Sequence, residues 1–189
     1  MFESARLLSR CFSSSLVLLG LLCAEAHAGS TQIVASDKVY AKNERWFIVT
    51  DGAGNACSLA VNFSSVEVLM LGVENKNGQL LSTLSYVRKN LNLSMQGNYR
   101  VKVTFENGDF YVRKARAIEV DDASGIIVDG MKPDFIAEFS RNKTINLKVG
   151  DVSYGTYDLT RSNDGVAKLF DCMRDTTKWD ITASMPLRH

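Results

Sequence analysis

The sequence predicts a mainly β fold, an antiparallel β-sandwich or barrel with one C-terminal α-helix. Many short runs alternate between apolar and polar residues, as strands with one buried face do. Turn signals rich in glycine, asparagine and aspartate separate these runs, and one stretch near the end of the chain has apolar residues at clear helical spacing. Short strands joined by tight turns favour antiparallel pairing, with the helix packed across one end.

Residues 1–28 have the pattern of a secretory signal peptide. Arg6 and Arg10 precede a short apolar core over 16–22, and Ala26-His27-Ala28 supplies the small residues that a signal peptidase recognises. The apolar core is far shorter than the ~20 residues that cross a bilayer. We therefore expect cleavage after residue 28 and a periplasmic or secreted protein.

Cys23 leaves one alternative open, a lipoprotein in which this cysteine becomes the lipidated N-terminus. The lipoprotein peptidase requires a small residue directly before the cysteine, and Leu22 is large. The soluble exported form is the favoured interpretation.

The rest of the chain predicts a single β-rich domain over 29–175 and a C-terminal tail over 176–189. The formal net charge of the whole chain is only +1, so bulk electrostatics give no reason to expect nucleic-acid binding. After cleavage, no apolar run is long enough to predict a transmembrane segment.

Cys57 and Cys172 are the two cysteines that remain after cleavage. In an exported protein they have one intramolecular pairing, and the resulting disulfide closes a long loop. The loop-entropy model assigns such a link roughly 4–5 kcal/mol. Two thiols fall short of the four ligands of a structural zinc site, so we expect no metal and no cofactor.

Strands joined by glycine-containing turns account for the first half of the domain. Residues 57–63 alternate cleanly, which places Cys57, Leu59, Val61 and Phe63 on one face. Strong turn signals at Asp51–Asn55 and Asn75–Gly78 separate neighbouring strands. The strands expected in this half are 46–49, 57–63, 66–73 and 80–87.

A hairpin over 99–120 is the clearest local unit. Its first strand alternates, and Asn107-Gly108 suits a type I′ turn. The return strand, 110–120, mixes apolar and charged residues on both faces, which predicts a bend or a bulge. Further strands are expected at 126–128, 144–149 and 152–159.

Two segments have helical features. Pro133–Phe139 fits either a short helix with proline in its first turn or an extended connection. Ser162-Asn163-Asp164 is a typical N-terminal cap, and the apolar residues that follow recur at helical spacing. The sequence therefore predicts an amphipathic helix over 163–174 that carries Cys172.

The shortage of histidine argues against an enzyme. His27 belongs to the signal peptide and His189 is the last residue, which disfavours Ser–His or Cys–His catalysis and His-based metal sites. Acidic pairs such as Glu67 with Glu74, or Asp121 with Asp122, fall in no recognisable motif. A carboxylate-dependent hydrolase stays open as an alternative, because a glycosidase needs only two acids.

Basic residues concentrate on the predicted hairpin, where aromatic residues are interleaved with them. Such a surface is able to bind an anionic surface or a glycan. The alternative interpretation is that the charges protect an exposed strand from aggregation. The candidate binding surface consists of Lys102, Tyr111, Arg113, Lys114 and Arg116.

Residues 157–172 resemble the ending of small exported proteobacterial proteins of the invasion-associated locus B family. In that pattern a strand reading x-Asp-Leu-x-Gly-Ser is followed by an alanine-rich helix that closes on a cysteine, and the early Trp46 followed by Cys57 loosely fits as well. Arg161 stands in place of the usual glycine, and a second internal disulfide is missing. The resemblance implies a β-sandwich that is not an enzyme and that supports host-cell interaction, virulence or envelope function.

Together these features predict an exported binding protein of the bacterial envelope whose partner is another protein or an envelope component. An inhibitor or immunity-type protein that blocks an enzyme is an alternative, because such proteins also need export, a disulfide and no catalytic residues. Its inserted loop would be Asp51–Asn55 or Asn75–Gly78.

Overall fold

The computed structural model describes residues 38–51, 53–64, 67–76, 79–120 and 123–177. The predicted signal peptide, including Cys23, and residues 178–189 of the predicted tail lie outside the described residues. The elements are β1 (Lys38–Lys42), β2 (Trp46–Thr50), β3 (Ala56–Ser64), β4 (Glu67–Lys76), β5 (Gln79–Arg88), β6 (Asn98–Phe105), β7 (Phe110–Val120), β8 (Ala123–Met131), α1 (Pro133–Arg141), β9 (Thr144–Val149), β10 (Val152–Asp158) and α2 (Ser162–Thr177).

All ten strands belong to one antiparallel sheet with the order β1-β2-β3-β4-β5-β8-β7-β6-β9-β10. Most neighbours in the sheet are also neighbours in the chain, as expected for strands joined by short turns. In the described part of the chain β1 and β10 each pair on one side only, so the sheet is not closed into a barrel. The mainly β, antiparallel fold with a C-terminal helix is confirmed, and the open sheet is compatible with a sandwich.

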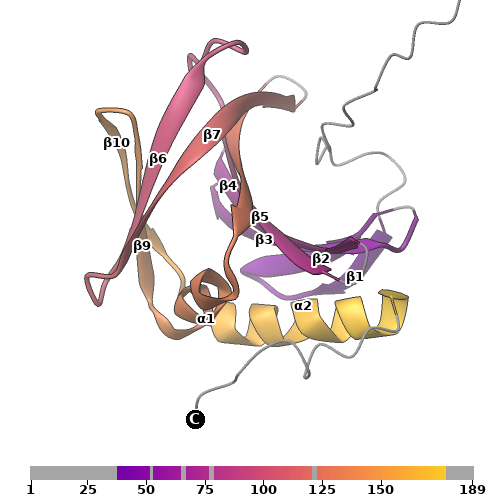
Figure 1. Ribbon diagram of the computed structural model, residues 1–189. Coiled ribbons are helices and arrows are strands. Elements are labelled where there is room, and N and C mark those ends of the chain that lie inside the picture. The colour runs from indigo at the N-terminus through magenta and orange to yellow at the C-terminus, as the bar shows by residue number, and fades with distance from the viewer. Residues whose placement is uncertain (1–37, 52, 65–66, 77–78, 121–122, 178–189) are drawn as a thin grey trace, which may run out of the picture.

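Both helices lie against the same face of this sheet (Figure 1). α2 packs on β2, β3 and β4 and also touches α1. Gly165 of α2 allows this close approach, because a Cβ there would lie 2.8 Å from Cδ1 of Leu59 and 3.4 Å from Cδ2 of Trp46. We call the face that packs against α1 and α2 the covered face, and the opposite face the helix-free face.

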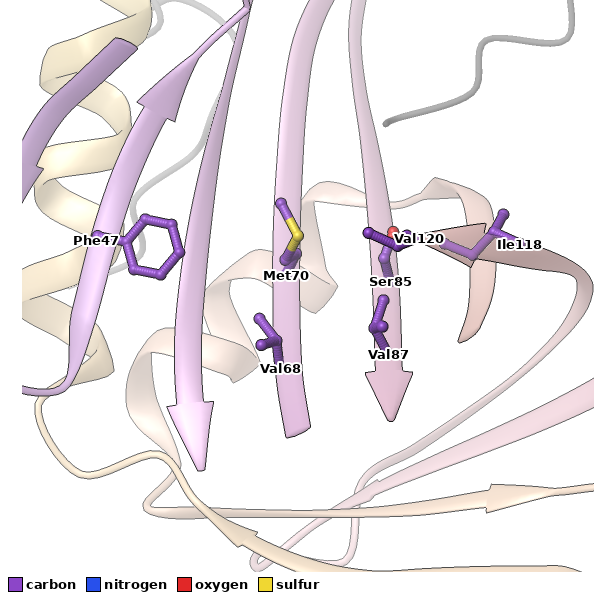
Figure 2. Close-up of a pocket in the computed structure, with 7 residues that line it drawn as sticks. All are labelled: Phe47, Val68, Met70, Ser85, Val87, Ile118 and Val120. Carbon is purple, nitrogen blue, oxygen red and sulfur yellow. The ribbon is translucent and has the colours of Figure 1, made fainter. Parts of the chain in front are cut away.

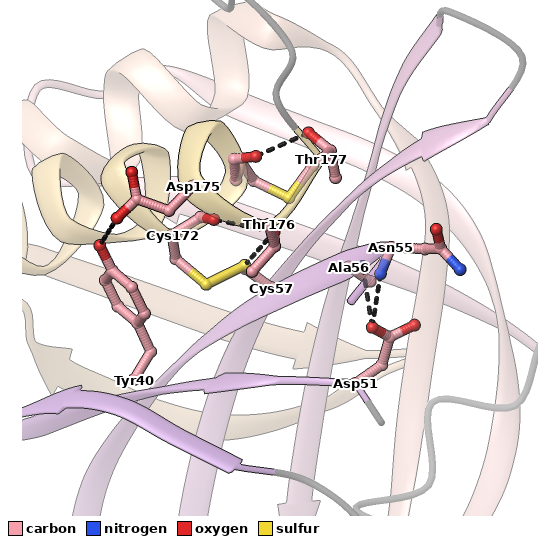
Figure 3. The surroundings of a disulfide bond; sticks show 10 residues. Tyr40, Asp51, Asn55, Ala56, Cys57, Cys172, Asp175, Thr176 and Thr177 are labelled. Atoms are coloured by element: carbon pink, nitrogen blue, oxygen red, sulfur yellow. Dashed lines mark hydrogen bonds between the residues drawn. A yellow bond between two sulfur atoms is a disulfide. The ribbon is translucent and has the colours of Figure 1, made fainter. Parts of the chain in front are cut away.

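The disulfide predicted from the sequence is present. Cys57 of β3 and Cys172 of α2 are bonded, with 6.2 Å between their Cα atoms. Figure 3 shows a second link between the helix and the start of the sheet, where the Tyr40 hydroxyl donates a hydrogen bond to Oδ2 of Asp175 at 2.5 Å. That hydrogen bond, with smaller contributions from burial and from nearby carboxylates, raises the pKa of Tyr40 to about 12.

The helical segments differ slightly from their predicted bounds. Residues 133–141 form a helix rather than an extended connection, because Phe135, Ile136 and Phe139 recur on one side and are buried. α2 continues to Thr177, so the first residues of the predicted tail are helical. Arg161, at the position where the resembled pattern has glycine, has a φ of 69°, a backbone conformation that glycine adopts without steric cost.

The return strand of the hairpin is bent and not bulged. β7 pairs with β6 from Phe110 to Arg116 and with β8 from Arg116 to Val120, both in unbroken register. The strand curves strongly in Figure 1. Its mixed pattern arises because both of its faces carry buried residues, Ala115 on one and Ile118 on the other.

Aromatic side chains of β10 fold the far edge of the sheet back over β3 and β5. The Tyr157 ring lies 4.6 Å from the ring of Phe63 and 5.6 Å from that of Tyr86, measured between centroids. The Tyr154 ring is 5.9 Å from Tyr86. These contacts join the end strand β10 to the interior strands β3 and β5 through one core, which also contains the buried residues of both helices.

Candidate binding site

The structure divides the five residues of the predicted binding surface between two faces of the sheet. Lys102, Lys114 and Arg116 lie on the helix-free face, because Lys102 is opposite Val112, and Val112, Lys114 and Arg116 alternate along β7. Tyr111 and Arg113 lie on the covered face. The Tyr111 ring packs 5.1 Å from that of Phe135, and burial raises the pKa of its hydroxyl.

The three cations on the helix-free face belong to a larger basic strip that crosses β7, β6 and β9. Arg100 pairs with Lys114, and Lys102 pairs with Lys148 of β9. We define the basic strip as Arg100, Lys102, Lys114, Arg116 and Lys148.

Sequence reasoning missed two members of the basic strip. Arg100 could have been found, because it alternates with Lys102 along one strand. Lys148 could not, because it enters the strip only through the pairing of β6 with β9. This pairing joins strands that are distant in the sequence.

Two carboxylates lie next to the five cations of the basic strip and neutralise only part of their charge. Nε of Arg116 lies 3.3 Å from Oδ2 of Asp129, and Nζ of Lys148 lies 4.0 Å from Oδ1 of Asp151. Nζ of Lys102 sits 4.7 Å from the centre of the Phe110 ring, in the range of a cation–π contact. The strip therefore keeps a net positive charge.

On the same face, a depression with apolar walls lies over the central strands. Its volume is about 90 Å³, and Figure 2 shows its side chains projecting from the side of the strands away from the helices. We define the apolar hollow by its lining residues, Phe47, Val68, Met70, Ser85, Val87, Ile118 and Val120.

Small residues stand beside the lining residues on neighbouring strands. Ala60 of β3 stands in register between Phe47 and Met70, and Gly125 of β8 is opposite Val87. A Cβ at Gly125 would lie 2.5 Å from the carbonyl oxygen of Tyr86, so this position requires glycine. The curvature of β7 brings its end to the edge of the hollow.

The hollow and the basic strip are continuous. Ser85 of the hollow is in register with Ile127, and Ile127 is in register with Arg116. Ile118 of the hollow follows Arg116 by two positions on β7 and points to the same side. One row across the sheet thus runs from the apolar side chains of the hollow to Arg116, and Lys114 follows two positions away on the same face of β7.

Glu67 takes part in a tyrosine cluster on the covered face. Its Oε1 accepts a hydrogen bond from the Tyr86 hydroxyl at 2.8 Å and lies 3.3 Å from Nε of Arg88. The Tyr86 hydroxyl also lies 2.6 Å from the hydroxyl oxygen of Tyr157, so its single proton is shared between Glu67 and Tyr157 as acceptors. Burial, followed by these hydrogen bonds, raises the pKa of Tyr86, and burial also raises that of Tyr157. The cluster fastens β10 to β4 and β5.

One acidic pair considered for hydrolysis, Glu67 with Glu74, is split between the two faces of the sheet. Glu67 and Glu74 lie an odd number of residues apart on β4, whose register with β5 is unbroken, so they face opposite sides of the sheet. Asp121 and Asp122 lie outside the described residues. In the part of the chain that the structure describes, no group of three or more His, Cys, Asp or Glu side chains is placed to hold a metal ion.

Two loops were considered as the segment that an inhibitor would insert into an enzyme, and each is described only in part. At Asp51–Asn55, Oδ1 of Asp51 accepts hydrogen bonds from the backbone N–H groups of Asn55 at 2.7 Å and Ala56 at 3.2 Å, which braces the turn. The second loop, Asn75–Gly78, includes two residues outside the described ranges.

None of the helices between residues 38 and 177 is both long enough and apolar enough to cross a membrane. Comparisons with protein-family models, curated proteins and solved structures found no match to the chain.

Proposed function

We propose that this chain is an exported binding protein without enzymatic activity that holds its partner on the helix-free face. The observation that carries the proposal is the apolar hollow on a sheet face that neither helix covers. Its lining is apolar except for Ser85, and concave sites with mostly apolar walls are where proteins usually hold ligands. Central strands of the sheet, which contribute Val68, Met70 and Val87, form the hollow and give it a rigid base.

Two features support export. The pattern over 1–28 is that of a signal peptide. The Cys57–Cys172 disulfide is of a kind that persists mainly in oxidising compartments such as the periplasm or the cell exterior. We propose a periplasmic or secreted location, with another protein or an envelope component as partner. The resemblance to the invasion-associated locus B family adds a role in host-cell interaction or virulence to this proposal.

A capture experiment tests the binding face. Oxidised protein produced from the full sequence is immobilised and incubated with bacterial envelope extract, and the retained proteins and lipids are identified. The same is done with Val87→Glu, which places a charge in the hollow, and with Val152→Glu, a matched change at a residue of β10 that is 56% exposed.

We expect a component that the wild type and Val152→Glu retain and that Val87→Glu retains about tenfold less, because an unpaired charge is costly in an apolar site. Melting curves confirm that all three proteins are folded. Equal retention by all three proteins, or no retention by any, would overturn the proposal.

A further inference from the structure

We infer that the occupant of the helix-free face is a single-chain anionic lipid, with its acyl chain in the apolar hollow and its charged head on the basic strip. This inference rests on the proposed function and names the chemical class of the ligand. The juxtaposition that carries it is the row of residues in register from Phe47 through Met70 and Ile127 to Arg116.

The lining of the hollow suits a hydrocarbon chain. Six of its seven side chains are apolar, and Ser85 supplies the single hydroxyl. A volume of about 90 Å³ is enough for part of an acyl chain and too small for a folded domain to enter. The row from β2 to β7 crosses five inter-strand steps of ~4.8 Å, about 24 Å in all. Ala60, Met70, Ser85 and Ile127 within this row are buried, so an acyl chain would lie mainly against the partly exposed side chains of the hollow, Phe47, Val68 and Val87.

The backbone of the central strands favours a lipid over an extended peptide. β3, β4, β5 and β8 are each paired on both sides, so their N–H and C=O groups are used within the sheet. A peptide laid across this face would bury its own amides without partners, which costs free energy for each group. An acyl chain has no such groups, and peptides that add to a sheet bind at its edge instead.

The charge at the end of the row selects the head group. Arg100, Lys102 and Lys114 are exposed and adjacent on β6 and β7, directly beyond the apolar part of the face. Arg116 stands at the boundary between the two regions. A carboxylate or phosphate at the end of the chain would lie among these cations, whereas a neutral head would leave their charge unmatched.

A titration with dansyl-labelled undecanoic acid tests this inference, and its uncharged alcohol analogue is the comparison probe. Both are kept below their micelle concentrations, and dansyl fluorescence reports binding to the oxidised protein produced from the full sequence. The variants are Val87→Glu in the hollow and Lys102→Glu/Lys114→Glu in the basic strip. The control is Lys132→Glu/Lys143→Glu, which makes the same charge change at exposed residues flanking α1.

We expect saturable binding of the acid by the wild type and the control, and at least about tenfold weaker binding by Val87→Glu. The Lys102→Glu/Lys114→Glu variant should bind the acid about tenfold more weakly and the alcohol with unchanged affinity. Added salt should weaken binding of the acid and leave binding of the alcohol unchanged. Oleate should displace the probe.

Absence of saturable binding would overturn the inference, and so would equal affinity of the acid for wild type and Val87→Glu. The capture experiment separates this failure from failure of the proposed function. If the acid does not bind but an envelope protein is retained in a hollow-dependent manner, the ligand class is wrong and the binding face stands. If neither result is obtained, both proposals fail.

Discussion

The two faces of the sheet are built from the same strands and differ in what lies on them. On the covered face, Leu59, Leu71 and Ile126 are at most 1% exposed, and the helices pack against this side. On the helix-free face, the neighbouring residues Phe47, Val68 and Val87 are only half-buried. An antiparallel sheet with one face in the core and the other in water normally has polar residues on the solvent face.

The difference teaches that apolar residues on both sides of a strand indicate two contact surfaces, even when the helices of the described residues cover only one of them. β4 shows this directly, because Leu69 and Leu71 face the core while Val68 and Met70 line the hollow. The covered face holds the core of the fold, and the helix-free face is the one on which we propose binding.

Removal of the disulfide should give the largest effect, because it releases α2 from the covered face. We expect Cys57→Ser/Cys172→Ser to lower the free energy of unfolding by about 4–5 kcal/mol relative to the oxidised wild type. Urea unfolding followed by circular dichroism measures this loss, with the wild type plus reductant as control. A loss of less than about 1 kcal/mol would mean that packing alone holds the helix.

Truncation of one apolar side chain on each face compares the two surfaces directly. Leu59→Ala removes a fully buried side chain beneath α2 and should cost about 3 kcal/mol. Val87→Ala, in the partly exposed hollow, should cost less than about 1 kcal/mol. Urea unfolding at neutral pH measures both, and equal losses would contradict the division of roles between the faces.

Alkaline pH should lower the free energy of unfolding by a smaller amount, because the tyrosines of the cluster ionise. The pKa values of Tyr86 and Tyr157 are raised in the folded protein, first by burial. The stability that these two protonated hydroxyls contribute is therefore fully present below the ordinary tyrosine pKa of about 10. It is lost as the pH rises above that value. We expect the urea midpoint to fall between about pH 10 and pH 12.

Tyr157→Phe is the matched variant for this pH effect. It should cost about 1 kcal/mol at neutral pH, because the hydroxyl donates a hydrogen bond to the Tyr154 carbonyl oxygen at 2.8 Å. Its stability should also decline less above pH 10 than that of the wild type. An equal decline in both proteins would assign the alkaline loss to other groups.

Local patterns in the sequence determined much of the fold. Alternation over 57–63 correctly placed Cys57 and Leu59 on one buried face, and helical spacing near the end located most of α2. The pairing of Cys57 with Cys172 followed from the small number of cysteines outside the predicted signal peptide. These features depend on neighbouring residues or on simple counting, so one sequence is enough to predict them.

The candidate site was decided by tertiary structure, because it depends on which strands lie side by side. The separation of Tyr111 and Arg113 from Lys114 and Arg116 is an exception, because it follows from alternation along one strand and was present in the sequence. Lys148 joins the basic strip only because β9 pairs with β6. The hollow draws side chains from β2, β4, β5 and β7, and no local pattern specifies that long-range register.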